Sequence, residues 1–227
     1  MDKPIRPIKS FVRRMGRKTH AQHEALAHLW PQFGVAPSEL AAALNDWASG
    51  PLTVEIGFGD GECLTQLAAR HPHRFYIGFE VHEPGVGHAL LEIQRLELQN
   101  VRLIKEDAQA VLAEHWPAQS IDEVLIYFPD PWHKSRHHKR RLVQPAFLTH
   151  LSTLIKPQGL VRLATDWPDY AHAMVRAFDE VGVFSNLAQP GPFLPRPSER
   201  PQTKFERRGL RLGQPSWDLC YQRNADR

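Results

Sequence analysis

A single aspartate between two prolines stands directly before the most cationic stretch of the chain. Proline fixes its own φ and lacks a backbone N–H, so Pro129-Asp130-Pro131 fits neither a central strand nor a helix interior. We therefore expect Asp130 to be a rigidly held carboxylate at a strand end. The cations that follow can bind phosphates, and Trp132 can stack on a base. The candidates are Lys134, Arg136, His137, His138, Lys139, Arg140 and Arg141.

Two other interpretations of this stretch exist. In the first, Trp132 belongs to the core and the charges are simply solvated. In the second, His133 and His137 form a metal-binding pair, because they are four residues apart. The flanking cations would repel a metal ion, so we expect no metal site.

A glycine-rich stretch, VEIGFGDGE, follows the first expected strand. Gly57, Gly59 and Gly61 allow a tight turn and a close approach of the backbone to a ligand. The spacing G-x-G-x-G differs from the dinucleotide pattern, and Glu62 stands where that pattern has its third glycine. A pyrophosphate at this helix N-terminus would be repelled by Glu62. The loop therefore favours a nucleoside-type ligand without phosphates.

Acidic residues mark the ends of three consecutive expected strands. Glu80 can accept hydrogen bonds from ribose hydroxyls, and Asp107 can accept one from an adenine amino group. Glu55, just before the glycines, can bind an ammonium group. Together these features suit S-adenosylmethionine. Each acid also has an ordinary alternative role: Glu55 could brace the loop, Glu80 could support a helix cap, and Asp107 could cap the helix that begins near residue 108.

Two later segments hold further acids. Asp166 lies two residues before Pro168. At this position Asp166 could cap a helix that begins near the proline, or it could contact the substrate. The segment TKFERRG, residues 203–209, places Glu206 among cations. A carboxylate can accept two hydrogen bonds from guanine N1–H and N2–H₂, so Glu206 is a candidate for reading that base.

The elements that must position these residues alternate between strands and helices. We expect strands at residues 52–59, 75–81, 101–107 and 121–131, a strand that begins at 160, and helices between them. This alternation predicts an α/β fold with a mostly parallel, doubly wound sheet. Residues 216–223 are expected to form a late antiparallel edge strand. Ligands in such sheets bind beyond the carboxyl ends of the strands.

Two segments lie outside the alternation. Residues 1–50 form a basic arm and a helical lead-in, and residues 51–227 form the main domain. Residues 185–201 contain five prolines and predict an extended loop. There is no apolar stretch long enough for a membrane span, no secretory signal pattern and no disulfide framework in the two cysteines, so we expect a cytoplasmic protein.

Positive charge is concentrated in two places. Residues 1–18 carry a net +6 and residues 134–141 a net +5, whereas the whole chain carries +3, so the remainder is about −8. Clustered positive charge on a mildly acidic body favours a polyanionic partner. A solvated tail together with a solvated helix face is the alternative.

With these residues, the chain resembles the TrmB family of bacterial tRNA (guanine-N7-)-methyltransferases. The resemblance rests on VEIGFGDGE, FYIGFEVH, KEDA, YFPDPWHKSRHHKRR, ATDW and TKFERRG, which lie in this order between residues 54 and 209. The FPDPWHK and TKFE motifs are specific, whereas the glycine loop indicates only a methyltransferase. The resemblance implies a class I, Rossmann-like methyltransferase fold with S-adenosylmethionine as donor. It also implies methylation of N7 of guanine-46 in the tRNA variable loop, which forms 7-methylguanosine.

The same resemblance implies roles for individual residues. Asp130 would be catalytic and would also face the cofactor. The rest of the cofactor site would be Glu55, Gly57, Gly59, Gly61, Glu80 and Asp107. The substrate contacts would be Lys134, Asp166, Thr203, Lys204, Phe205 and Glu206. The RNA-binding segment would be Arg136, His137, His138, Lys139, Arg140 and Arg141.

Other functions remain open at this point. A methyltransferase acting on a small molecule or a protein would leave the two basic clusters unexplained, and its substrate affinity would depend weakly on salt. A non-catalytic RNA-binding module would not bind the cofactor. The glycine spacing disfavours a nicotinamide dehydrogenase. We expect a tRNA partner and either a monomer or a homodimer.

Overall fold

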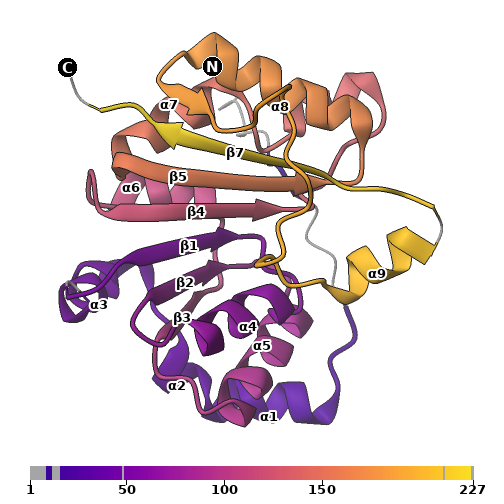
Figure 1. The fold of residues 1–227 in the computed structure, drawn as a ribbon. Coiled ribbons are helices and arrows are strands. Elements are labelled where there is room, and N and C mark those ends of the chain that lie inside the picture. The colour runs from indigo at the N-terminus through magenta and orange to yellow at the C-terminus, as the bar shows by residue number, and fades with distance from the viewer. Residues whose placement is uncertain (1–8, 12–15, 48, 212, 226–227) are drawn as a thin grey trace, which may run out of the picture.

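The computed structural model describes residues 9–11, 16–47, 49–211 and 213–225. A seven-stranded sheet runs through this part of the chain in the order β3-β2-β1-β4-β5-β7-β6 (Figure 1). The strands are β1 (Leu52–Ile56), β2 (Phe75–Phe79), β3 (Val101–Ile104), β4 (Ile121–Tyr127), β5 (Ile155–Thr165), β6 (Phe184–Asn186) and β7 (Trp217–Arg223).

The strands from β3 to β5 pair in parallel, and β7 pairs antiparallel to both β5 and β6. The predicted mostly parallel, doubly wound α/β sheet is therefore confirmed. The predicted late antiparallel strand is β7, and the three-residue β6 pairs along its outer side. The strands β1, β2 and β3 succeed one another in one direction, and β4 then pairs with the other side of β1. Such a reversal is where open α/β sheets bind their ligands.

Helices cover both faces of the sheet, so each parallel strand is buried between two apolar layers. One apolar cluster joins the sheet to α1, α2, α4 and α5, and the other joins it to α3, α6, α7 and α8. The bounds are α1 (His20–His28), α2 (Trp30–Phe33), α3 (Leu40–Asp46), α4 (Glu62–Arg70), α5 (Glu83–Arg95), α6 (Ala108–His115), α7 (Pro145–Leu154), α8 (Pro168–Val181) and α9 (Lys204–Arg211), with 3₁₀ turns η1 (Pro37–Glu39) and η2 (Ser135–Arg140).

Local sequence signals explain several helix ends. Thr19 accepts a hydrogen bond from Gln22 N, and the Gln22 side chain returns one to Thr19 N, which forms a capping box for α1. The helix α8 begins with Pro168 and ends before Gly182, whose φ of 68° is left-handed. These caps fix the directions in which the chain enters and leaves the helices.

The lead-in to the first strand packs onto the main domain. Ala25 and Phe33 belong to one apolar cluster, Leu40 belongs to the other, and Gly34 bridges to Leu103 of β3. The domain boundary at residue 50 stays a prediction. Much of the basic arm, at residues 1–8 and 12–15, lies outside the described residues.

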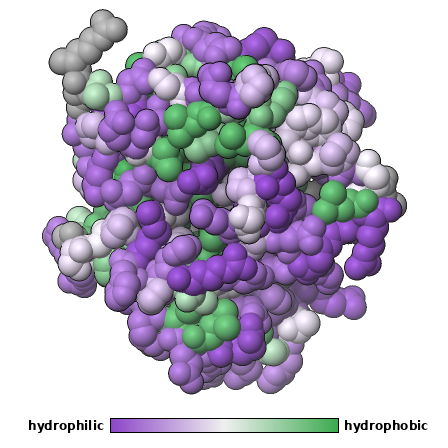
Figure 2. Space-filling view, in the orientation of Figure 1, coloured by the Kyte–Doolittle hydropathy of each residue, from purple (hydrophilic) through white to green (hydrophobic). Residues whose placement is uncertain are grey.

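The face of the molecule seen in Figure 1 is largely hydrophilic, and its hydrophobic residues form separate patches (Figure 2). Val183, Leu187 and Leu210 are the large hydrophobic side chains that are exposed among the described residues. In that part of the chain, no helix has the length and apolar character needed to cross a membrane.

Candidate active site

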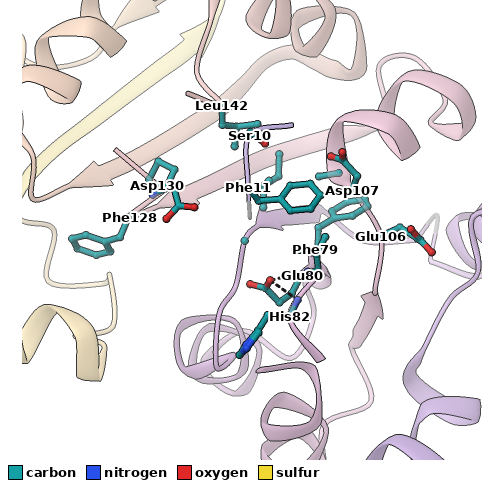
Figure 3. Close-up of a pocket in the computed structure, with 15 residues that line it drawn as sticks. Ser10, Phe11, Phe79, Glu80, His82, Glu106, Asp107, Phe128, Asp130 and Leu142 are labelled. Atoms are coloured by element: carbon teal, nitrogen blue, oxygen red, sulfur yellow. Dashed lines mark hydrogen bonds between the residues drawn. The ribbon is translucent and has the colours of Figure 1, made fainter. Parts of the chain in front are cut away.

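A cavity of about 400 Å³ opens at the carboxyl ends of β1, β2 and β4 and beside the start of α6 (Figure 3). Its volume lies within the usual range for pockets that bind small ligands. Four of the residues predicted from the sequence line it, namely Gly57, Glu80, Asp107 and Asp130. The structure thus brings together residues that are far apart in the chain.

The glycine loop between β1 and α4 has left-handed backbone at all three predicted glycines. The φ angles of Gly57, Gly59 and Gly61 are 77°, 59° and 78°. A Cβ added to Gly61 would also lie 2.6 Å from the Ala89 Cβ, so both its backbone and its surroundings require glycine. Because Gly57 lines the cavity, the backbone of the loop can come close to a ligand there.

Glu80 holds the glycine loop from the end of β2. Its Oε2 accepts a hydrogen bond from Gly59 N at 2.9 Å, and its Oε1 accepts bonds from Val81 N and His82 N at 2.7 and 2.9 Å. Glu80 therefore braces the loop, a role that the sequence suggested for Glu55, and through His82 N it also contacts the N-cap residue of α5. A carboxylate has about four acceptor positions, so it can still accept a further bond from a ligand hydroxyl.

Asp107 also combines two roles. Its side chain caps α6 by accepting a hydrogen bond from Gln109 N at 3.2 Å, as the alternative interpretation expected. The same residue lines the large cavity. The cap holds the carboxylate in place at the ligand's edge of the sheet.

Glu55 is the buried acid of the site. Its side-chain Oε2 has no hydrogen-bond partner in the described part of the chain. Burial, and to a smaller extent the charge of Glu80, raises the pKa of Glu55 to about 8. A second cavity of about 120 Å³ lies between Glu55, the glycine loop and the residues Thr203 and Lys204. An acceptor left unsatisfied beside a cavity suits a ligand that carries an ammonium group.

Asp130 lies on a turn with unusual backbone at both of its ends. Phe128 and Trp132 have φ angles of 53° and 48°, which cost residues with side chains roughly 1–2 kcal/mol each. Strain of this kind concentrates at functional sites. Asp130 itself is exposed in the large cavity, and none of the hydrogen bonds or ion pairs among the described residues involves it. Its carboxylate therefore lies on a turn with constrained backbone and is open to a ligand.

The cationic run divides into an outward and an inward set. Lys134, Arg136 and Lys139 are exposed. Arg140 instead lies 4.1 Å from the centre of the Trp132 ring and donates to Lys9 O at 3.1 Å. The outward set is available to phosphates, whereas Arg140 links the run to the N-terminal segment.

Arg141 is buried. It donates to an Asp169 carboxylate oxygen at 2.6 Å and to Pro131 O at 2.9 Å, and its side chain is only 3% exposed. The hydrogen bond from Arg141 holds the pKa of Asp169 below its usual value. In this arrangement Arg141 supports the turn that carries Asp130, and its assignment to RNA stays a prediction.

The two histidines of the run are half-buried. His137 stacks near the Trp132 ring at 5.8 Å, and His138 lies 3.1 Å from an Arg141 nitrogen. Trp132 is itself enclosed, because its Nε1 donates to Ser10 O at 3.0 Å. It is therefore neither a core residue nor a free stacking platform. His133 contacts the Trp167 ring, and none of the residue clusters that the structure describes could hold a metal ion.

The described residues 9–11 of the N-terminal segment reach the large cavity. Ser10 and Phe11 line it, and in Figure 3 the Phe11 ring projects toward Phe79 and Asp107. No sequence signal indicates this placement beyond the presence of one aromatic residue in a basic arm.

Asp166 precedes α8 but does not cap it. The cap residue is Trp167, and no side chain makes the capping bond. Asp166 takes part in no hydrogen bond or ion pair within the described ranges. The capping alternative is not found, and the contact of Asp166 with substrate stays a prediction.

The TKFE segment begins α9 and makes structural bonds of its own. Thr203 Oγ1 accepts from Glu206 N at 3.3 Å, which is half of a capping box. The Glu206 carboxylate does not complete the box but binds Arg196 and Arg200, and its side chain is 2% exposed. Its predicted contact with guanine is untested, and in this arrangement both oxygens are occupied. The Phe205 side chain lies outside what the structure describes.

Arg200 is a residue that sequence reasoning missed. It donates to Asp218 of β7 at 2.7 Å as well as to Glu206, and its guanidinium lies over the rings of Tyr127 and Phe128. It therefore joins the proline-rich loop, α9, β7 and the turn before Asp130. An arginine in a polar loop carries no local signal of such a role.

Comparison with known proteins agrees with this geometry. The family model described as "Putative methyltransferase" matches residues 49–219. The solved structure of the 16S rRNA methyltransferase KamB has a TM-score of 0.61 and 14% identity and covers 81% of this chain and 93% of its own. A 16S rRNA (adenine(1408)-N(1))-methyltransferase with cosubstrate SAM has a TM-score of 0.55 at 17% identity and covers 85% of this chain and 93% of its own. The fold is that of class I methyltransferases.

Full-length relatives narrow the class. A tRNA (guanine-N(7)-)-methyltransferase of Halorhodospira halophila is 48% identical over 224 residues and covers 97% of both chains. That of Alkalilimnicola ehrlichii is 50% identical over 222 residues, which are 96% of this chain and 93% of the relative. The chain belongs to the tRNA (guanine-N7-)-methyltransferase family, which confirms the resemblance.

Proposed function

We propose that this protein transfers a methyl group from S-adenosylmethionine to N7 of guanine-46 in the variable loop of tRNA and so forms 7-methylguanosine. The observation that carries the proposal is the unengaged Asp130 carboxylate in a cavity at the strand ends, beside an exposed set of cations. Full-length relatives named as tRNA (guanine-N(7)-)-methyltransferases support the reaction class.

The residues fit S-adenosylmethionine. Glu55 offers an unsatisfied buried acceptor for the ammonium group, and Glu80 retains acceptor capacity for the ribose hydroxyls. Asp107 stands at the cavity edge for the adenine amino group. When bound, the cofactor supplies a methyl group already activated by a sulfonium. The glycine loop permits close contact without any phosphate site.

The proposed reaction requires little proton transfer by the protein. Guanine N7 carries a lone pair and no proton, so no strong general base is required. Catalysis rests on alignment of acceptor and donor and on stabilising the positive charge that develops on the purine. Asp130 suits this task because its turn is rigid and its carboxylate faces the cavity.

The outward cations explain the choice of a nucleic acid. Lys134, Arg136 and Lys139 are exposed beside the turn that carries Asp130, where they would bind phosphates of the tRNA backbone. Asp166 and Lys204 remain the proposed contacts near the acceptor base. A cytoplasmic location and a monomeric or homodimeric state remain predictions.

The deciding experiment measures transfer of labelled methyl groups from S-adenosylmethionine to unmodified tRNA transcripts. Borohydride and aniline then cleave the product at 7-methylguanine. We expect a single cut in the variable loop that disappears when guanine-46 is replaced. Incorporation at another site would refute the proposed position, and absence of incorporation with intact cofactor binding would refute the tRNA activity.

A further inference from the structure

A carboxylate at the end of the glycine loop binds the helix that follows the proline-rich loop. Glu62, the first residue of α4, accepts a hydrogen bond from Lys204 N at 2.6 Å and pairs with Arg207 at 2.9 Å. The partners are 142 and 145 residues away in the sequence. Glu62 thus joins the cofactor side of the site to α9.

The other side of the same loop is held by Glu80. Gly59 N donates to Glu80 Oε2, so residues 57–62 form a short bridge between Glu80 and α9. A ligand whose ribose engages Glu80 shares this carboxylate with the loop. The position of the loop therefore depends on what Glu80 binds.

The helix α9 depends on few anchors. Figure 1 shows it beyond the strand ends, apart from the helical layers on the sheet. Its first turn is held by Glu62, by the Thr203 cap and by the arginines that bind Glu206. Of these anchors, Glu62 is the one that directly follows the glycine loop, and it lines the second cavity together with Glu55 and Gly57.

We propose that Glu62 is a positioning residue that couples occupancy of the cofactor cavity to binding of tRNA by α9. A ligand that fixes the glycine loop also fixes Glu62, which in turn holds Lys204 and Arg207 in one place. Coupling of this kind is reciprocal, so tRNA also strengthens binding of the cofactor. The inference rests on the proposed function, because it assigns tRNA as the partner of α9.

The ion pair between Glu62 and Arg207 suits a modest coupling between cofactor binding and tRNA binding. The side chains of Glu62 and Arg207 are 27% and 41% exposed, so solvent weakens their attraction. The charge-assisted bond to Lys204 N adds to it. Typical couplings between two sites correspond to about 5-fold or more in affinity, and we expect the lower end here.

The test compares the dissociation constant of an unmodified tRNA transcript with and without saturating S-adenosylhomocysteine, which cannot react. We expect the wild-type ratio to be about fivefold. Glu62→Ala should bring it close to one, and Glu62→Gln should give an intermediate ratio because it keeps an acceptor for Lys204 N. A purely structural role would weaken tRNA binding equally in both conditions and leave the ratio unchanged.

Glu92→Gln is the matched control. Glu92 pairs with Arg95 on the surface of α5 at 2.6 Å, and its side chain is also 27% exposed. This variant should keep the wild-type ratio. A ratio that falls equally in Glu92→Gln and Glu62→Gln would overturn the proposal.

A double-mutant cycle tests whether Glu62 and Arg207 act together in this coupling. Arg207→Ala should lower the ratio as Glu62→Gln does, and the double variant should lower it no further. Additive effects, or a wild-type ratio of one, would overturn the coupling. Methylation of tRNA by the wild-type protein is measured in parallel, so failure of the proposed function is distinguished from failure of the coupling.

Discussion

The half of the site proposed for the cofactor and the half proposed for the substrate use charged residues in different ways. On the cofactor side, Glu55, Glu80 and Asp107 stand at successive strand ends and either reach the cavities or brace their rims. On the substrate side, Arg141 and Glu206 look like ligand contacts in the sequence but are buried in ion pairs. The fold thus gives Arg141 and Glu206 charged protein partners, and their contacts with a ligand stay predictions.

The largest expected effect is a loss of stability on replacing Arg200, the buried arginine that joins α9, β7 and the turn before Asp130. Arg200→Met removes the partner of Asp218 and one partner of Glu206, and leaving a buried charge unpaired costs about 3–5 kcal/mol. Urea denaturation should show this loss in the free energy of unfolding. Arg95→Met, which breaks an exposed pair with Glu92, should change it by less than about 1 kcal/mol. A loss of less than about 1 kcal/mol in Arg200→Met would show that the buried cluster of Arg200, Glu206 and Asp218 contributes little to stability.

The next prediction separates an effect on the chemical step from an effect on tRNA binding. Asp130→Asn keeps the shape of the side chain but removes its charge, so we expect kcat to fall about 100-fold, as for loss of one preorganised electrostatic contact. The dissociation constant for tRNA should change less than twofold, because the cations are untouched. Single-turnover kinetics and filter binding measure the two quantities. Asp179→Asn, on the exposed side of α8, serves as the control, and near-native turnover of Asp130→Asn would exclude the catalytic role.

A smaller effect contrasts two arginines of the same run. Arg136→Gln should weaken tRNA binding severalfold and reduce the slope of log K against log salt by about one, without changing stability. Arg141→Gln should leave the slope unchanged and lower the free energy of unfolding by about 1–2 kcal/mol, because Asp169 and Pro131 O lose their donor. Binding at several salt concentrations and chemical denaturation decide the matter. Equal salt slopes for both variants would mean that the inward and outward sets do not differ in function.

The smallest expected effect is the release of a proton when the cofactor binds. The pKa of Glu55, raised to about 8, leaves this carboxyl protonated at pH 7 in the free protein. A bound ammonium group favours the carboxylate and lowers this pKa, so binding of S-adenosylmethionine at pH 7 should release about one proton. The release should fade above about pH 9, where Glu55 is already ionised. Calorimetry in buffers of different ionisation enthalpy measures it, and Glu55→Gln should abolish it. Release that persists in Glu55→Gln would assign the proton to another group.

Much of the cofactor side was predictable because its signals are local. Alternating strands and helices indicate a doubly wound sheet, and in such a sheet the residue that ends a strand lies at the ligand edge. Glu55, Glu80 and the glycines are within a few residues of their strand ends. The capping alternative for Asp107 was also local and is found, whereas the bond that braces the glycine loop comes from Glu80, although bracing was suggested for Glu55.

The substrate side was less predictable because its partners are distant in the sequence. Thr203-Lys204-Phe205-Glu206 has the spacing of a capping box, yet only the Thr203 half forms, since Glu206 binds arginines instead. The placement of Phe11 in the cavity and the bond from Trp132 to Ser10 O join segments more than 100 residues apart. No periodicity or motif specifies such contacts.

The sequence alone determined the sheet, the acids at its strand ends and the clustering of positive charge, because spacing and local conformational preference set each of them. Only the tertiary structure decided which charges remain free. Arg141 is neutralised by Asp169 and Arg200 by Asp218, whereas Arg136 and Asp130 stay exposed. The physical reason is that a buried side chain keeps its charge only when folding brings a partner to it, and those partners lie on other elements; Glu55, buried without such a partner among the described residues, has a raised pKa instead.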